Sequence, residues 1–253
     1  MRTVFAALTA VIATLVFGPT VVIARLFRIP SGPTSIYARA VRLWAKSINR
    51  AAGVSIRVHG AQRMAQAHGA VFISNHVSWF DIFALASEVP WCSFIAKAEL
   101  RRIPLFGFAA ESVGIVFIDR ENRKQAFESY RSAADEVQRG RSIIVCPEGT
   151  RGTDYHLRPF KKGPFVLAIA SQAPIVPTIV HGTREVMPKG TFRVRSGPID
   201  VHFLEPISTT GHTYDDRQEL MAAAWNRMAG ELRSRYGIGT AEAPIATEGA
   251  GAD

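Results

Sequence analysis

Short β-rich runs, several of them with consecutive apolar residues in place of an alternating pattern, constrain the fold of this chain more than any other feature. Strands of that kind are typical of a sheet that is covered on both faces. Helical patterns lie between many of the runs, at residues 123–139, 164–172 and 215–236. The alternation predicts an α/β fold with a largely parallel central sheet flanked by helices. The predicted strands cover residues 54–58, 70–74, 92–96, 114–119, 142–146, 174–180, 192–196 and 200–204.

The N-terminal segment has no charged residue from Thr3 to Ala24. As a helix it is about 33 Å long, enough to cross the ~30 Å hydrocarbon core of a bilayer. We expect Gly18-Pro19 to interrupt it, so both a full span and entry into one leaflet stay open. A signal peptide is the competing interpretation, although no convincing A-x-A cleavage site is present. Positive charge follows at Arg25 and Arg28, which predicts a cytoplasmic C-terminal side.

Residues 33–52 form an amphipathic pattern with an apolar face opposite a basic face. Such a helix suits the surface of an anionic membrane, and it equally suits an ordinary surface helix packed on a domain. Because it follows the apolar segment, we predict a two-helix membrane motif over residues 1–52, an α/β domain over 53–236 and a disordered tail over 237–253. The apolar face holds Ile36, Tyr37, Ala40, Val41, Trp44 and Ile48, and the basic face holds Arg39, Arg42, Lys46 and Arg50.

The composition is ordinary apart from a net charge of +9, which fits nucleic acid, an anionic membrane face or anionic substrates. A basic peripheral protein without enzymatic activity is therefore one hypothesis, but no nucleic-acid-binding motif supports it. The sequence lacks the motifs HExxH, GxSxG, GxxxxGK[ST] and GxGxxG. The usual sequence support for a zinc protease, an α/β-hydrolase, a P-loop NTPase or a Rossmann protein is therefore missing. Cys92 and Cys146 form no CxxC pair, and no metal site is predicted.

One motif pairs a histidine with an aspartate directly after a predicted strand, in "FISNHVSWFDIFAL". At a strand-to-helix turn, Asp81 can accept a hydrogen bond from His76, fix its tautomer and stabilise its imidazolium form. A helix N-cap role for Asp81 and a structural role for His76 fit the same residues. Ser78 as an acyl-enzyme nucleophile is a further alternative. The other histidines, at positions 59, 68, 156, 181, 202 and 212, have no clear partner and are expected to be surface or structural residues.

Further polar residues follow other predicted strands, where ligands of open α/β folds collect. The cations among them suit the binding of a phosphate group, and Gly149 allows close approach of backbone to a ligand. Each single residue fits a solvated loop equally well. The set comprises Lys97, Asp119, Arg120, Glu148, Gly149, Thr150, Arg151, Lys161 and Lys162.

Taken in order, four blocks make residues 54–210 resemble the lysophosphatidic acid acyltransferase family, the 1-acyl-sn-glycerol-3-phosphate acyltransferases. Asn75-His76 through Asp81 matches the NHx4D block, and residues 114–120 match GxxFIDR. Residues 147–151 match the EGTR block, and Val176-Pro177 matches the late VP block. The N-terminal helices are also similar to the membrane-dipping motif of bacterial members.

The resemblance implies that His76, oriented by Asp81, is the general base for acyl transfer to the sn-2 hydroxyl of lysophosphatidic acid. The donor is acyl-CoA or acyl-carrier protein, with no metal or other cofactor. The same chemistry on a lyso-ornithine lipid or another lysophospholipid is the alternative. The implied location is the cytoplasmic face of the inner membrane, with no nucleic acid partner. The implied acceptor-binding residues are Arg120, Glu148, Gly149, Thr150 and Arg151, with Lys97 as a further phosphate contact.

Overall fold

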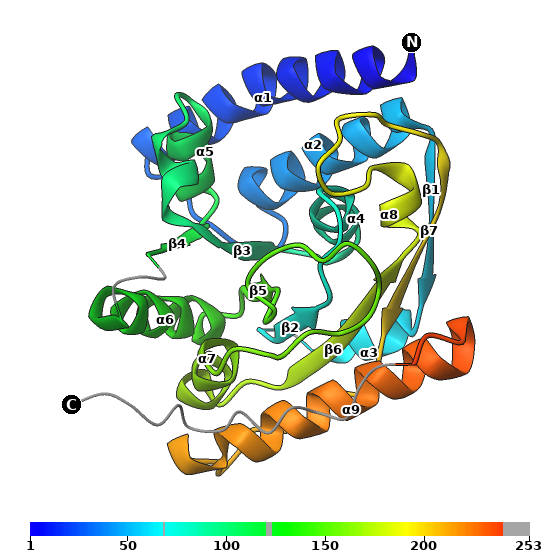
Figure 1. Ribbon diagram of the computed structural model, residues 1–253. Helices are drawn as coiled ribbons and strands as arrows, with labels where there is room; N and C mark the ends of the chain where they lie inside the picture. Colours follow the sequence, from blue (N-terminus) through cyan, green and yellow to red (C-terminus); the bar gives the residue numbers. More distant parts are fainter. Residues whose placement is uncertain (68, 120–122, 240–253) are drawn as a thin grey trace, which may run out of the picture.

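The computed structural model describes residues 1–67, 69–119 and 123–239, with the backbone alone at positions 66, 123, 124 and 127. Within these ranges seven strands form one sheet in the order β1-β7-β6-β2-β5-β3-β4 (Figure 1). All neighbouring strands are parallel except β6 and β7, so the predicted α/β fold is confirmed. The strands are β1 (Val54–His59), β2 (Val71–Ser74), β3 (Cys92–Lys97), β4 (Val116–Ile118), β5 (Ser142–Val145), β6 (Ile175–His181) and β7 (Gly197–Phe203).

Helices cover both faces of the sheet, as strands with consecutive apolar residues require. Residues from α6, α7 and α9 share one buried cluster with β2, β5 and β6, and residues from α2 and α4 share a second cluster with the other face. Every residue of β2 and β5 is buried. The helices are α1 (Arg2–Leu26), α2 (Ile36–Ala52), α3 (Ala61–Gln66), α4 (Phe80–Glu88), α5 (Phe106–Ser112), α6 (Arg123–Gln138), α7 (Gly163–Ser171), α8 (Thr183–Val186) and α9 (Arg217–Tyr236), with 3-10 turns at Ala98–Arg102 and Tyr214–Asp216.

Helix α1 runs through Pro19 without a break, so the predicted interruption at Gly18-Pro19 is wrong. The position packs against α5, where a Cβ added to Gly18 would lie only 3.5 Å from Leu105 Cγ. Contact along this side holds the helix together although Pro19 has no N–H to donate. At the next residue, the hydroxyl of Thr20 donates to the main-chain carbonyl of Val16 at 2.7 Å. By length and composition, α1 is long and apolar enough to cross a membrane.

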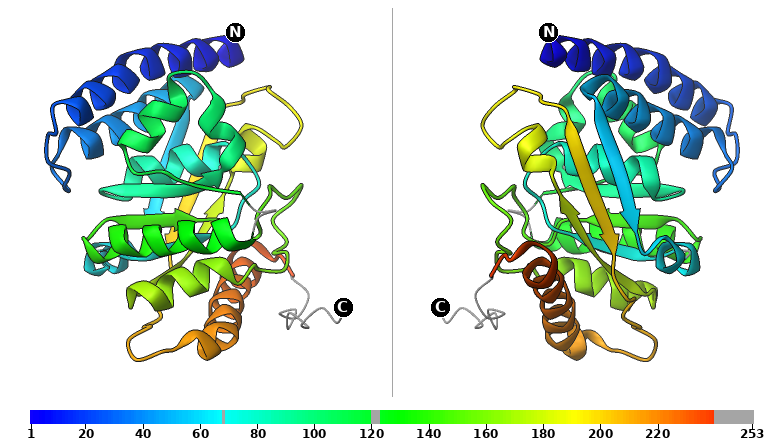
Figure 2. Two further views of the ribbon diagram at one scale, coloured as in Figure 1. Left: turned by 90° about the vertical axis from the view of Figure 1, so that its left-hand side faces the viewer. Right: turned by 90° about the vertical axis from the view of Figure 1, so that its right-hand side faces the viewer.

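The two sides of α1 differ. Its buried residues, most of them small, are Ala6, Ala13, Gly18, Val21 and Ala24. One apolar stripe points away from the rest of the protein, and each member of that stripe is more than half exposed. Figures 1 and 2 show α1 lying along the outside of the domain, at the end opposite α9. We call the stripe the α1 outer face; it consists of Val4, Phe5, Leu8, Val11, Ile12, Leu15, Val16, Ile23 and Leu26.

Most of the apolar face of α2 is buried in the protein and is not available to lipid. Tyr37 and Ala40 pack against α1, and Ile48 belongs to the core cluster that includes α4 and the sheet. Trp44 reaches α1, where its indole N–H donates to Thr14 Oγ1 at 3.0 Å. Of the two interpretations left open for α2, the structure supports the helix packed on the domain. The division into residues 1–52 and 53–236 stays a prediction.

The strand predicted at residues 192–196 is absent, and β7 begins only at Gly197. Backbone groups here bind other partners: Val194 N donates to Thr3 Oγ1 and Arg195 N donates to the carbonyl of Val186. Because Phe192 is 84% exposed, no buried face fixes a strand register for this segment. The predicted disordered tail lies outside the described residues from position 240 onward.

The centre of the sheet should dominate the stability. Phe72 on β2 is buried and lies edge-to-face with Phe203, at 5.7 Å between ring centroids. We expect Phe72→Ala to reduce the free energy of unfolding by about 3–5 kcal/mol, because it leaves a cavity in a packed core. Phe192→Ala, at an exposed phenylalanine, should cost less than about 0.5 kcal/mol. Chemical denaturation of both variants tests this, and equal losses would contradict the position of the core.

Candidate active site

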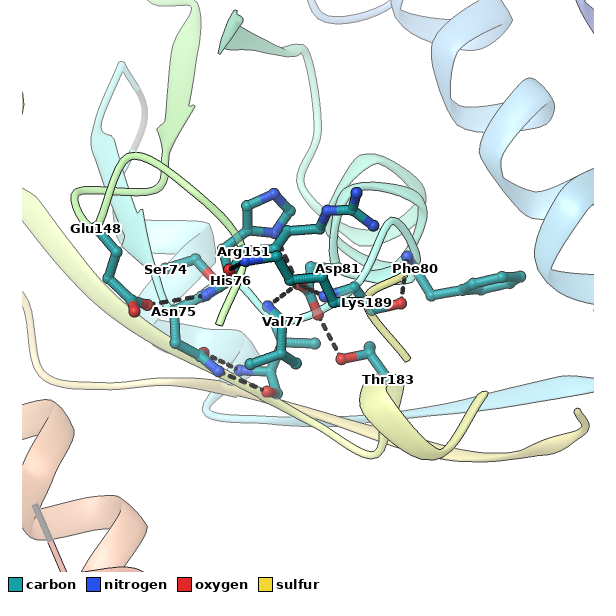
Figure 3. Close-up of polar contacts among 12 residues, drawn as sticks. Ser74, Asn75, His76, Val77, Phe80, Asp81, Glu148, Arg151, Thr183 and Lys189 are labelled. Atoms are coloured by element: carbon teal, nitrogen blue, oxygen red, sulfur yellow. Dashed lines mark hydrogen bonds and ion pairs between the residues drawn. The ribbon is translucent and has the colours of Figure 1, made fainter. Parts of the chain in front are cut away.

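The predicted pairing of His76 with Asp81 is present. His76 Nδ1 lies 2.8 Å from Asp81 Oδ2, and the Asp81 side chain is 0% exposed (Figure 3). His76 follows β2, and Asp81 is the second residue of α4, so the turn between strand and helix brings them together. The ring of His76 is 16% exposed. Among the described residues nothing hydrogen-bonds to its Nε2, which leaves that nitrogen available to act on a ligand.

The carboxylate of Asp81 accepts three more hydrogen bonds besides that from the histidine. The backbone N–H groups of Val77 and Ser78 donate to Oδ2 at 2.7 and 2.8 Å, and the Thr183 hydroxyl donates to Oδ1 at 2.5 Å. These donors compensate for burying a negative charge and hold the carboxylate in one orientation. Thr183 lies 102 positions away on α8, and the sequence contains no local signal for its role.

Ser78 and Asn75 have structural contacts in this turn. The buried Ser78 hydroxyl donates to the carbonyl of Met187 at 2.7 Å, which gives no support to the nucleophile alternative. Asn75 donates to the carbonyl of Val180 at 3.0 Å and accepts from its N–H at 2.8 Å. This pair of bonds continues the contact between β2 and β6 beyond the last strand residue. Asn75 therefore fixes the start of this turn.

The loop after β5, residues 146–162, lies beside the turn between β2 and α4, residues 75–79, which we call the histidine turn. Glu148 Oε1 accepts the backbone N–H of His76 at 3.1 Å, and the loop's Gly152 N–H donates to the His76 carbonyl at 2.7 Å. The Arg151 guanidinium lies 5.0 Å above the ring of Trp79, the residue before α4. Figure 3 shows the His76 ring and the Arg151 guanidinium extending to the same side. The structure thus brings Glu148 and Arg151 to His76.

Gly149 occupies a turn that only glycine suits, with φ at +79°. A Cβ there would lie 2.8 Å from Lys161 Cε, so the lysine stem already covers this position. The Gly149 N–H donates to the carbonyl of Cys146. This amide is therefore already paired within the loop. The Thr150 hydroxyl accepts a hydrogen bond from Arg158 Nη1 at 3.0 Å.

One predicted cation, Lys97, stands apart from this group. Lys97 ends β3, two strands from β2, and forms an exposed ion pair with Glu99 at 2.5 Å. Arg120 lies outside the described residues. Their predicted contacts with the acceptor stay predictions.

The expectation that the other histidines have no clear partner is wrong for His59, His181 and His202, and also for the exposed His156, which pairs with Asp154 at 3.2 Å. His59 Nε2 lies 2.8 Å from Asp200 Oδ1, and its ring stacks on His202 at 4.3 Å. His202 Nε2 lies 2.7 Å from the Tyr236 hydroxyl, and Tyr236 stacks on His181. His59, Asp200 and His202 are residue types that bind metals, with ligand atoms within 4.8 Å of one another. Since Arg57 also binds Asp200 at 2.6 Å, this carboxylate is already neutralised within the protein.

The geometry agrees with a comparison against protein families. The family model described as Acyltransferase matches residues 55–181, a range that contains His76, Asp81 and the loop after β5.

The chain belongs to the acyltransferase family.

Curated relatives are similar to 64% and 70% of the chain. The 1-acyl-sn-glycerol-3-phosphate acyltransferase of Limnanthes douglasii is 39% identical over 165 residues, covering 64% of this chain and 58% of its own length. The human 1-acyl-sn-glycerol-3-phosphate acyltransferase alpha is 33% identical over 180 residues, covering 70% of this chain and 64% of its own length. The chain thus spans less than two thirds of the length of these relatives.

A solved structure shares the acyltransferase fold. The 1-acyl-sn-glycerophosphate acyltransferase PlsC from Thermotoga maritima superposes with a TM-score of 0.74, covering 93% of this chain and 96% of its own. The two chains are 24% identical, so this likeness bears on the fold alone.

The acyltransferase domain should lose stability in mild acid through His202. Burial, and then the neighbouring His59, lower the pKa of His202 from 6.5 to about 4. Between these values the unfolded chain binds a proton that the folded protein does not, so the free energy of unfolding should fall as pH decreases from about 6.5 toward 4. In His202→Gln the decrease should be smaller.

Denaturant titrations across this pH range measure the difference. His156→Gln, at an exposed histidine that pairs with Asp154, is the matched control. Identical pH dependence in the protein and in His202→Gln would contradict the expectation.

Proposed function

We propose that this protein transfers an acyl group from acyl-CoA or acyl-carrier protein to the sn-2 hydroxyl of lysophosphatidic acid, giving phosphatidic acid. The observation that carries the proposal is the 2.8 Å contact between His76 Nδ1 and the fully buried Asp81 carboxylate. The names of the curated relatives support the same activity.

In the proposed reaction His76 is the general base. With Nδ1–H donated to Asp81, Nε2 has a lone pair to accept the proton of the lipid hydroxyl. The hydroxyl oxygen attacks the thioester carbonyl, the new C–O ester bond forms and the C–S bond breaks. The proton on the imidazolium then passes to the departing thiolate. The lipid supplies the nucleophile, so the scheme uses no acyl-enzyme, metal or other cofactor.

The acceptor phosphate is proposed to bind cations at the strand ends. Arg151 is the best supported, since its stacking on Trp79 places it beside the histidine turn. A guanidinium matches phosphate geometry and remains charged at all relevant pH values. Arg120 and Lys97 are proposed as further contacts on the basis of the family motifs. Gly149 and Thr150 are proposed to shape the same site.

We also propose that the protein works at the cytoplasmic face of the inner membrane. The α1 outer face is a continuous apolar stripe, which in a soluble monomer would be unusually large. Arg2 begins the helix, and Arg25 and Arg28 lie at its other end. Cations at both ends of a helix that lies in the interface suit anionic headgroups.

Replacing the base tests the reaction. We expect His76→Ala to lower the rate of acyl transfer by about 10²–10⁴-fold, the usual contribution of a general base. His156→Ala, at an exposed histidine, should keep full activity. Asp81→Asn should also reduce turnover, because the ring loses its charged partner. The measurement is mass-spectrometric detection of product from purified full-length protein in lipid vesicles.

The same assay identifies the substrates. It combines acyl-CoA or acyl-carrier protein with lysophosphatidate, a lyso-ornithine lipid and other lysophospholipids. Phosphatidic acid as the main product supports the proposal. Turnover of another acceptor without turnover of lysophosphatidate would show that the proposed substrate is wrong. Full activity in His76→Ala would refute the mechanism.

Charge on the α1 outer face should release the protein from membranes. Leu8 and Leu15 are both more than half exposed, and each buried leucine contributes about 2 kcal/mol. The double change Leu8→Glu and Leu15→Glu should therefore lower partitioning by at least about 100-fold. Tyr214→Glu, an exposed residue at the α9 end, is the control and should bind normally. Co-sedimentation with anionic vesicles measures binding, and undiminished binding of the double variant would contradict the orientation.

A further inference from the structure

The backbone of His76 is held on both sides by the loop after β5. Its N–H donates to Glu148 Oε1 at 3.1 Å, and its carbonyl accepts the N–H of Gly152 at 2.7 Å. Asp81 fixes the ring from within its own turn. The direction in which Nε2 points therefore depends on two separate groups of contacts. One belongs to the histidine turn and the other to the loop after β5.

Glu148 is enclosed in this arrangement. Its side chain is 3% exposed, and both carboxylate oxygens have partners: Oε1 binds His76 N–H and Oε2 accepts from Arg158 Nε at 2.8 Å. Burial raises the pKa of Glu148, and the charge of Arg158 acts against that rise. The ionised form of Glu148 thus depends on Arg158.

Arg158 also binds the other side of the Gly149 turn. Its Nη1 donates to Thr150 Oγ1 at 3.0 Å, and its Nη2 donates to the Thr150 carbonyl. A planar guanidinium can hold these groups at once because its donors have a fixed geometry. One side chain therefore connects the glutamate that holds His76 to the residue that precedes Arg151.

We infer that Arg158 is a positioning residue for acyl transfer, acting through Glu148 on the backbone of His76. The inference rests on the proposed function, since the step affected is proton removal by His76. Glu148 then acts on the general base and not on the acceptor. Removing Arg158 should displace His76, including its ring, while leaving Asp81 and the Arg151 side chain in place.

The experiment compares Arg158→Gln, Arg158→Lys, Glu148→Gln and the double variant in the full-length protein. Arg158→Gln should lower kcat by about 10²-fold, the typical effect of displacing a catalytic group by 1 Å, with little change in KM. The acid limb of its kcat–pH profile should move to higher pH, because Glu148 without its counter-charge takes up a proton more readily. Arg158→Lys should restore much of kcat and the acid limb because it keeps the charge.

Two controls separate positioning from general damage. Arg184→Gln removes an arginine that binds the same loop, at Thr153, without touching Glu148, and it should keep normal kcat. The double variant should lose no more activity than Glu148→Gln alone, because the two residues act in one chain of contacts. Thermal unfolding identifies any variant that is not folded.

A measurement without substrate completes the test. Hydrogen exchange of the peptide over residues 72–79 should be faster in Arg158→Gln than in the unchanged protein or Arg184→Gln, because the His76 amide loses a firmly held acceptor. Unchanged kcat or unchanged exchange in Arg158→Gln overturns the inference. No acyl transfer by the unchanged protein overturns the proposed function instead, and hydrogen exchange then decides the positioning role alone.

Discussion

The geometry of the candidate active site depends on one buried negative charge, the carboxylate of Asp81. Asp81 has no solvent contact and accepts from His76, two backbone amides and Thr183. An ionised carboxylate without such donors would destabilise the fold strongly. The same contacts that satisfy the charge set the path of the turn after β2 and join α4 to α8. Stability and ring orientation therefore have a common origin.

Much of the fold was predictable because its signals are local. Consecutive apolar residues mark β2 and β5 as central strands, and seven of the eight predicted strands have counterparts in the described sheet. The pairing of His76 with Asp81 could be predicted for the same reason, because the two residues lie only five positions apart across one turn. Helix α1 departed from prediction because contact with α5, a tertiary effect, outweighs the local cost of Pro19.

The remaining site residues could not be found in this way. Thr183 and Asn75 act through partners more than a hundred positions away, which no local pattern reveals. In the sequence Arg158 looks like one more solvated charge, and its role becomes visible only in the folded loop after β5, where it binds the buried Glu148. The segment at 192–196 has strand-forming residues, but its amides bind Thr3 and Val186 in place of a neighbouring strand.

The packing of small α1 residues against the domain has a geometric consequence. Ala6, Ala13 and Ala24 are buried in contacts that leave little freedom between the helix and the body it covers. An anchor attached in this way cannot swing as a flexible tether does. With α1 as the proposed membrane anchor, the height and tilt of the reaction centre above the lipid layer would be constant properties of the fold. Vertical distance, as much as headgroup recognition, would then decide which lipid hydroxyl the proposed base can reach.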